Sequence, residues 1–185
     1  MAESASVKVN ATCEHLKQLI REVPDFPKKG ILFYDITTLL RDKTGFARLI
    51  DLFSEHYIGK QVDLILGMEA RGFIFGPALA YRLNAGFVPV RKPGKLPAAA
   101  ARVEYSLEYG SNALEMHKDA IEHGQRVLIV DDLLATGGTA EATARLATSM
   151  GAEIAGLAFV VELDFLKGRD KLKQYEVFSL LHYDK

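Results

Sequence analysis

The sequence predicts an α/β fold in which a largely parallel central sheet is flanked by helices. Apolar stretches typical of strands alternate with helical patterns of ten to fifteen residues, which is the arrangement of βαβ units. The segment Val127–Val130 is wholly apolar and mostly β-branched, and this favours a strand buried on both faces. Small residues then lead into another helical pattern. A parallel sheet with helices on its faces accounts for all three observations.

Length and composition indicate one domain spanning residues 1–185. The formal net charge is −1, so no global field attracts nucleic acid or an anionic membrane. Cys13 is the only cysteine, which excludes an internal disulfide and fits a reducing compartment. The first residues lack the pattern of a secretory signal, and the longest apolar stretch, 155–161, is far short of the roughly 20 residues that a membrane helix needs. We therefore expect a cytoplasmic protein with neither nucleic acid nor membrane as partner.

The N-terminal part begins with a predicted helix over about residues 12–22, where Leu16, Leu19 and Ile20 recur at helical spacing. The prolines and glycine between residues 24 and 30 then predict an irregular loop. A short extended piece is expected at 31–36. A helix should follow over 45–57, with one apolar side buried.

The remainder supplies the sheet. Helices are expected at Gly72–Leu83 and Gly138–Met150, the second capped by Gly151. Weak alternation on both sides of residues 110–112 predicts a hairpin, with strands Val103–Tyr109 and Ala113–Lys118. The expected strands of the central sheet are Val62–Met68, Phe87–Arg91, 126–131, Ile154–Val161 and Tyr175–Leu181.

Two acids, Asp131 and Asp132, stand at the carboxyl end of the buried strand, where open α/β sheets hold their ligands. The small residues after them begin a helix, whose first N–H groups attract anions. No lysine follows the glycines, which excludes the P-loop of nucleotide hydrolases. The anion-binding loop consists of Ala135, Thr136, Gly137, Gly138 and Thr139. A ligand with a phosphate at one end and hydroxyls or a metal beside it, such as a ribose 5-phosphate, fits this pattern.

This segment resembles the motif with which type I phosphoribosyltransferases bind 5-phosphoribosyl 1-pyrophosphate (PRPP). Further stretches are similar to the adenine phosphoribosyltransferases, in the order and spacing of that family: Val23–Asp35, Gly67–Pro77, Arg91–Pro97 and Tyr105–Gly110. The resemblance implies the type I phosphoribosyltransferase fold: a largely parallel central sheet of five strands, an N-terminal helix and hood segment over about residues 1–36, and a flexible active-site loop and hairpin over about 92–118.

The resemblance also implies an activity. Adenine and PRPP would give AMP and pyrophosphate, with Mg²⁺ as cofactor, through an oxocarbenium-like transition state. Asp131 and Asp132 would hold the ribose hydroxyls, directly or through Mg²⁺, and residues 135–139 would bind the 5-phosphate. Mg²⁺ itself would be held mainly by PRPP and water. Family members are commonly homodimers, so we expect one here.

Two basic regions would handle pyrophosphate. In the family, Glu69, Ala70 and Arg71 form the pyrophosphate loop, often with a cis peptide between the first two. Arg91, Lys92 and Lys95 would add cations from a lid, of which the run 98–101 has no packing anchor. Without the resemblance, Arg71 would be interpreted as half of a surface ion pair and the lid cations as solvated charges.

The base would lie between the hood and the acidic strand. In the family, Leu32, Phe33 and Tyr34 form the hood, whose aromatic ring stacks on adenine, and Tyr34 stands where many relatives carry Arg. Leu133 would pack on the other face of the base. Glu108 would act near N7 as a proton-handling group, and Tyr109 would close over the site. Without the resemblance, Phe33 would be interpreted as hydrophobic core and Glu108 as an exposed acid of a hairpin.

Two alternatives remain open. A phosphoribosyltransferase for another purine base would share the PRPP site and differ in the hood. A non-catalytic regulator that senses PRPP would keep the fold without the reaction. The five histidines show no metal-binding spacing and are interpreted as structural or surface residues.

Overall fold

The computed structural model describes residues 13–106 and 111–185, which form two compact units: one ends at Leu52 and the other runs from Phe53 to Lys185. Within these two described ranges, no helix has both the length and the apolar composition needed to cross a membrane.

The N-terminal unit contains an antiparallel strand pair that the sequence did not predict. Residues 13–18 are helical, but β1 (Arg21–Pro24) is a strand and pairs with β2 (Leu32–Asp35). The predicted continuation of the helix to residue 22 is therefore wrong. Pairing with β2 gives the backbone of β1 its hydrogen bonds, and Arg21 Nε donates to Asp35 Oδ2 at 3.0 Å across the pair.

Two helices follow in this unit. The short helix α2 covers Thr37–Arg41, and α3 covers Lys43–Tyr57, so that its last turn belongs to the second unit. The α3 helix begins two residues before the predicted start at Gly45. Asp42 explains this start, because its Oδ1 atom accepts from the N–H groups of Thr44 (3.1 Å) and Gly45 (2.7 Å).

The second unit is built on a five-stranded sheet in the order β4-β3-β7-β8-β9, with every neighbouring pair parallel. This confirms the predicted α/β class. The middle residues of β3, β7 and β8 are buried, as expected for a sheet covered on both faces. Their bounds are β3 Leu64–Met68, β4 Gly86–Val90, β7 Arg126–Leu134, β8 Glu153–Leu163 and β9 Val177–Tyr183.

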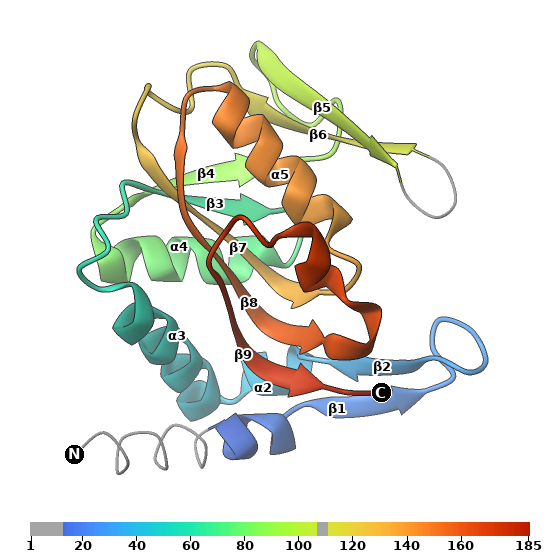
Figure 1. The fold of residues 1–185 in the computed structure, drawn as a ribbon. Coiled ribbons are helices and arrows are strands. Elements are labelled where there is room, and N and C mark those ends of the chain that lie inside the picture. Colours follow the sequence, from blue (N-terminus) through green and yellow to red (C-terminus); the bar gives the residue numbers. More distant parts are fainter. Residues whose placement is uncertain (1–12, 107–110) are drawn as a thin grey trace. The chain divides into compact units, whose positions relative to one another are not determined.

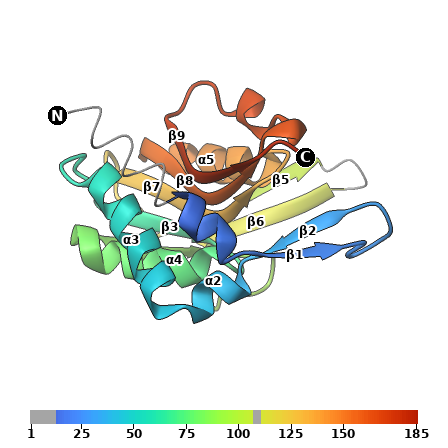
Figure 2. The ribbon, with the colours of Figure 1, turned by 90° about the horizontal axis from the view of Figure 1, so that it is seen from below.

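The connections between the strands make the strand order of this sheet reverse at one place, the switch point. From β3 the chain passes through α4 (Gly72–Leu83) to β4 on one side, and from β7 it passes through α5 (Gly138–Ser149) to β8 on the other. The two helices cover opposite faces of the sheet (Figures 1 and 2). The strand order therefore reverses between β3 and β7, and ligands of open α/β sheets bind at the carboxyl ends of such strands.

The predicted hairpin is present as β5 (Ala100–Ser106) and β6 (Ser111–His117), which pair antiparallel beside α5 (Figure 1). Its tip, residues 107–110, lies outside the described residues. The interpretation of 98–101 as a run without an anchor is wrong for Ala100 and Ala101. Both are paired in β5, and Ala101 also packs against the hydrophobic core.

The predicted strands of the sheet differ from the observed ones at their ends. The strand expected at 126–131 runs on to Leu134, so the acid pair lies within β7 rather than after it. The β8 strand extends two residues beyond the predicted end at Val161, and β9 starts at Val177 rather than Tyr175. Between β8 and β9 the chain forms two 3₁₀ turns, η1 (Asp164–Leu166) and η2 (Gly168–Lys171).

Candidate active site

The loop Ala135–Thr139 connects β7 to α5 at the switch point of the sheet. Gly137 precedes the first residue of α5 and has a φ of +76°, a conformation that L side chains rarely adopt. The first N–H groups of a helix have no acceptor within the helix, and they form the positive end of its dipole. An anion would therefore be stabilised at this loop, and the binding of a phosphate there stays a prediction.

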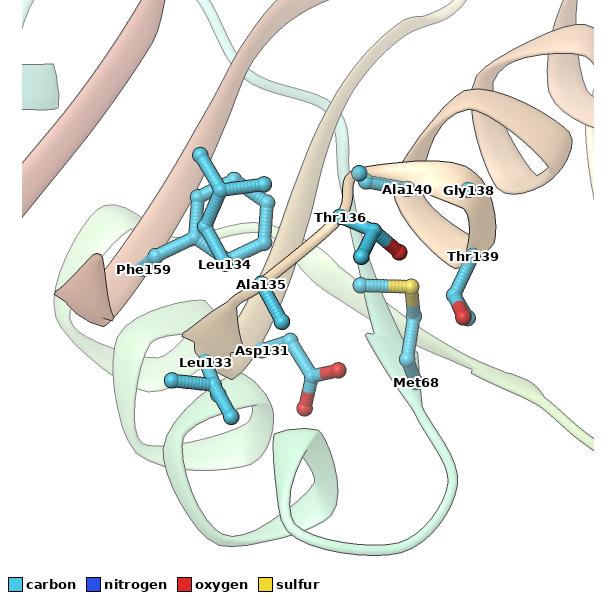
Figure 3. A pocket seen from close by; sticks show the side chains of 11 residues that line it. Met68, Asp131, Leu133, Leu134, Ala135, Thr136, Gly138, Thr139, Ala140 and Phe159 are labelled. Atoms are coloured by element: carbon cyan, nitrogen blue, oxygen red, sulfur yellow. The ribbon is translucent and has the colours of Figure 1, made fainter. Parts of the chain in front are cut away.

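A pocket of about 80 Å³ lies over this loop (Figure 3). Three apolar side chains from three neighbouring strands line it, those of Met68, Leu134 and Phe159, and each of these residues is at most 1% exposed. Asp131, Thr136 and Thr139 also line it and add a carboxylate and two hydroxyls. The lining also includes Leu133, Ala135, Gly137, Gly138 and Ala140. One end of the pocket thus suits a phosphate, and the other suits hydroxyls or a cation.

The acid pair contacts Arg71, which directly precedes α4. The Asp132 N–H donates to Asp131 Oδ1 at 2.9 Å, and Asp132 Oδ2 lies 2.9 Å from Arg71 Nε. Burial raises the pKa of Asp131, and the neighbouring charge of Asp132 raises it further. Burial also raises the pKa of Asp132, although Arg71 opposes that rise. The two carboxylates are therefore held in a site where negative charge is costly without a ligand.

Gly72 allows this close approach. It begins α4 directly after Arg71, and a Cβ there would lie 2.6 Å from the carbonyl oxygen of Val130 and 3.3 Å from Asp131 Oδ1. Any side chain at this position would separate the start of α4 from the end of β7.

The predicted pyrophosphate loop connects β3 to α4, and the expected cis peptide joins Glu69 to Ala70. Glu69 Oε2 accepts from Arg91 Nε and from the Lys92 N–H, each at 3.1 Å. Burial acts to raise the pKa of Glu69, but these two hydrogen bonds and the charges of Arg91 and Lys95 outweigh it, and the pKa is lowered. Arg91 Nη1 also donates to the Lys95 carbonyl at 3.0 Å. The structure thus brings both predicted basic regions together around Glu69.

The predicted base-binding residues are spread over different parts of the chain. Leu133 lines the pocket. Leu32, Phe33 and Tyr34 lie on β2 of the N-terminal unit, where Phe33 makes an edge contact with Phe26 at 5.1 Å between ring centroids. Glu108 and Tyr109 lie outside the described residues. The roles given to these side chains stay predictions.

The sequence analysis did not identify three residues that support the loop Ala135–Thr139, which we call the phosphate loop. Tyr105 Oη on β5 lies 3.3 Å from Thr139 Oγ1, and Thr143 Oγ1 donates to the Thr139 carbonyl at 2.9 Å. Gly168 contacts the loop from the connection between β8 and β9. Tyr105 begins one of the stretches that carry the resemblance, so a signal for it is present in the sequence. No local pattern marks Gly168.

Comparison with known proteins agrees with this geometry. Residues 35–183 match the phosphoribosyl transferase domain family. The adenine phosphoribosyltransferase of Acidobacterium capsulatum is 72% identical over 174 residues, which are 94% of this chain and 96% of that protein.

Solved structures have the same fold over nearly the whole chain. The adenine phosphoribosyltransferase of Thermoanaerobacter pseudethanolicus has a TM-score of 0.89 at 55% identity, covering 92% of this chain and 99% of its own. The Saccharomyces cerevisiae enzyme, solved with adenine and D-2,5-dideoxy-2,5-imino-altritol 1,6-bisphosphate, also has a TM-score of 0.89, at 45% identity, with 93% and 99% covered. The chain therefore belongs to the phosphoribosyl transferase family and, within it, to the adenine phosphoribosyltransferases.

Proposed function

We propose that this chain transfers the 5-phosphoribosyl group of PRPP to N9 of adenine, giving AMP and pyrophosphate in purine salvage. The observation that carries the proposal is the pocket at the switch point, where Asp131 of the acid pair and a loop of glycine and threonine residues lie side by side. A ribose 5-phosphate needs both an anion site and a site for its hydroxyls. Membership of the adenine phosphoribosyltransferases supports adenine as the acceptor base.

The phosphate loop binds the 5-phosphate of PRPP and then of AMP. Backbone N–H groups at the start of α5 and the hydroxyls of Thr136 and Thr139 are its donors. The contribution to catalysis is positional, because a fixed phosphate leaves ribose C1 in one place relative to the base and to pyrophosphate. Asp131 and Asp132 hold the 2- and 3-hydroxyls.

Mg²⁺ fits the donor chemistry of the site. Oxygen ligands, carboxylates among them, are the ones that it prefers, and burial raises the pKa values of Asp131 and Asp132, so a cation there would offset the cost of burying their negative charge. The ion would be held mainly by PRPP and water, and these two acids would be its ligands on the chain. When bound, it neutralises charge on the pyrophosphate.

Arg71 stabilises the departing pyrophosphate. In the structure its Nε atom pairs with Asp132, which keeps the pyrophosphate loop and the acidic strand together. When PRPP binds, Arg71 turns to the pyrophosphate oxygens and Asp132 turns to the ribose. Lys92 and Lys95 add positive charge, while Arg91 and Glu69 shape the loop around Ala70. Charge that develops as the C1–oxygen bond breaks is thus met by fixed cations.

The adenine base is held by apolar and aromatic side chains. Phe33 stacks on adenine, and Leu32 and Tyr34 complete the hood around it. Leu133 packs against the opposite face. Glu108 takes up or delivers a proton near N7, and Tyr109 closes over the site to exclude water, which would otherwise hydrolyse PRPP.

We further propose that the protein acts in the cytoplasm as a homodimer. A single cysteine fits a reducing compartment. Ile74 and Tyr81 are exposed on α4, Tyr81 at 87%, and such apolar surface supports self-association. Sedimentation equilibrium would measure the assembly, and a mass near that of one chain would contradict it.

The decisive experiment measures pyrophosphate release from PRPP and Mg²⁺ with each nucleobase in turn. Release with adenine alone, together with AMP, is the expected result. Release with guanine or hypoxanthine instead would keep the PRPP site and overturn the hood assignment. PRPP binding without release with any base would make the protein a sensor.

A further inference from the structure

The connection between β8 and β9, residues 164–176, lies directly against the phosphate loop. A Cβ on Gly168 would overlap the carbonyl oxygen of Ala135 and would lie 3.0 Å from the backbone nitrogen of Gly137. In the other direction, a Cβ on Gly137 would overlap the carbonyl oxygen of Gly168. The two backbones touch with no room for a side chain on either. The position of Gly168 therefore limits where the Gly137 N–H can point.

The connection is held in place directly after Gly168, by Arg169 and Leu172. Arg169 donates two hydrogen bonds to Glu162, from Nε to Oε1 at 2.8 Å and from Nη2 to Oε2 at 2.7 Å, and Nη1 donates to the Val177 carbonyl at 2.9 Å. Leu172 is fully buried in the hydrophobic core. One guanidinium thus ties the end of β8, the connection and the start of β9 together.

Glu162 stands beside the phosphate loop in the sheet. It pairs in register with Leu134, the last residue of β7 before that loop, and it is only 3% exposed. A bidentate pair with a buried carboxylate fixes both position and orientation. Any movement of Arg169 would be passed to its neighbour Gly168 and from there to residues 135–137.

A metal site is the other interpretation of this region. Ligand atoms of Glu162, Asp164 and His182 lie within 4.8 Å of one another. Arg169, however, already occupies both oxygens of Glu162, and His182 Nδ1 lies 3.0 Å from Asp164 Oδ1. Because a positively charged side chain already pairs with both Glu162 oxygens, we interpret the group as an ion-pair network and not as a metal site.

We propose that Gly168, held in place by the Glu162–Arg169 pair, is a positioning residue for the 5-phosphate of PRPP. Its backbone sets the conformation of the loop at Gly137 and so aligns the N–H groups that bind phosphate. The inference rests on the proposed function, because it assigns a support to that same phosphate site.

Gly168→Ala tests the contact. The φ of Gly168 lies outside the left-handed region, so alanine is not strained by backbone conformation there. Its effect comes from the new Cβ, which presses on the Ala135 carbonyl and lies 3.0 Å from the Gly137 nitrogen and from Leu134 Cδ1. We expect the KM for PRPP and the Kd for ribose 5-phosphate, measured by calorimetry, to rise roughly tenfold or more. The KM for adenine should stay within about twofold, since its base contacts are elsewhere.

Gly86→Ala is the matched control. It lies at the amino end of β4, and its new Cβ would meet the flexible end of the Leu64 side chain at 2.7 Å. Stability should fall somewhat, with no selective change in the KM for PRPP. A rise in both substrates' KM values in Gly168→Ala, or an unchanged KM for PRPP, would overturn the proposal.

Arg169 variants test the fastening and remain informative if Gly168→Ala fails to fold. Arg169→Gln should raise the KM for PRPP selectively, and Arg169→Lys, which keeps the charge but not the two-point contact, should recover part of the loss. Equal KM values for PRPP in the wild type and Arg169→Gln would overturn the positioning role. A wild-type protein that forms no AMP would instead overturn the proposed function, so the two failures are distinguishable.

Discussion

Two buried acidic groups lie at the carboxyl ends of neighbouring strands, and their surroundings affect them in opposite ways. Asp132 on β7 is 4% exposed and Glu162 on β8 is 3% exposed. An arginine approaches each of them. Nevertheless, the pKa of Asp132 is raised and that of Glu162 is lowered. Burial alone therefore does not decide the state of a carboxylate in this protein.

The partners explain the difference. Arg169 contacts both oxygens of Glu162, and its hydrogen bonds and charge outweigh the effect of burial on the pKa. Asp132 contacts an arginine, Arg71, and lies beside a second acid, Asp131. The pKa of Asp131 is itself raised by burial and by the charge of Asp132. At the β8 site, which consists of Glu162 and Arg169, the chain itself supplies the positive charge and the hydrogen bonds that the carboxylate needs. The β7 site, Asp131 and Asp132, has raised pKa values, which is the arrangement expected of a binding site. Under the proposed function, Mg²⁺ would supply positive charge there and the ribose hydroxyls would supply hydrogen-bond donors.

The largest effect should come from removing both acids of β7. We expect Asp131→Asn combined with Asp132→Asn to cut turnover by roughly three orders of magnitude, since the ribose and Mg²⁺ would lose their carboxylates. The fold should persist, because the amides keep the shape. Steady-state pyrophosphate release would measure the change, with circular dichroism as the control for folding. Turnover near that of the wild type would exclude the acids from the mechanism.

A substitution in the β8 site should lower the stability of the folded protein. Glu162→Gln leaves the Arg169 guanidinium without a charged partner, and we expect the free energy of unfolding to fall by about 2 kcal/mol. This is less than for a fully buried pair, because the Arg169 side chain is 45% exposed. Urea denaturation would measure it. The pKa of Glu162 is lowered in the folded state, so this stabilisation is present above its unfolded pKa and is lost as the pH falls toward the folded value. A difference from the wild type that grows on acidification would contradict the assignment.

Asp131→Asn alone should change the free energy of unfolding in the opposite direction and raise it. A raised pKa in the folded state means that the wild type loses stability as the pH rises from the unfolded value toward the folded one. Asparagine cannot ionise, so we expect the variant to be more stable near neutral pH by about 1 kcal/mol, or roughly 2–4 °C in Tm. Thermal unfolding followed between pH 4 and pH 8 would show a gain that increases with pH. A variant less stable than the wild type at pH 7 would show that Asp131 is structurally satisfied.

The same two regions show how far the sequence leads. The strand, loop and helix that carry the acid pair were predictable, because an apolar strand, two acids, two glycines and a helix start follow one another in 13 residues, Val127–Thr139. Residues that are neighbours in this segment of the sequence are also neighbours in the structure, so their order predicts their arrangement. The parallel sheet was predictable for a similar reason, since strands buried on both faces are apolar throughout.

The β8 site was not predictable from local patterns. Glu162, Arg169 and Val177 are separated along the chain, and only the return of the chain to β9 brings them together. The strand pair β1–β2 was missed because residues 16–20 have helical spacing, whereas the pairing of Arg21 with Asp35 spans a loop. Contacts of this kind depend on which segments meet, and a single sequence does not contain that information in its periodicity.

The smallest effect should come from the hairpin side of the phosphate loop. Tyr105→Phe removes the hydroxyl that lies 3.3 Å from Thr139 Oγ1, while the ring keeps its packing against the core. A single neutral hydrogen bond contributes about 1 kcal/mol, so we expect the KM for PRPP to rise about threefold to fivefold. Substrate kinetics with PRPP and adenine varied separately would measure it. Thr139→Ser keeps the hydroxyl and should change KM less than Tyr105→Phe does. If Tyr105→Phe left KM unchanged, the support of the phosphate loop would come from the β8–β9 connection and α5 alone, and the hairpin would have no part in phosphate binding.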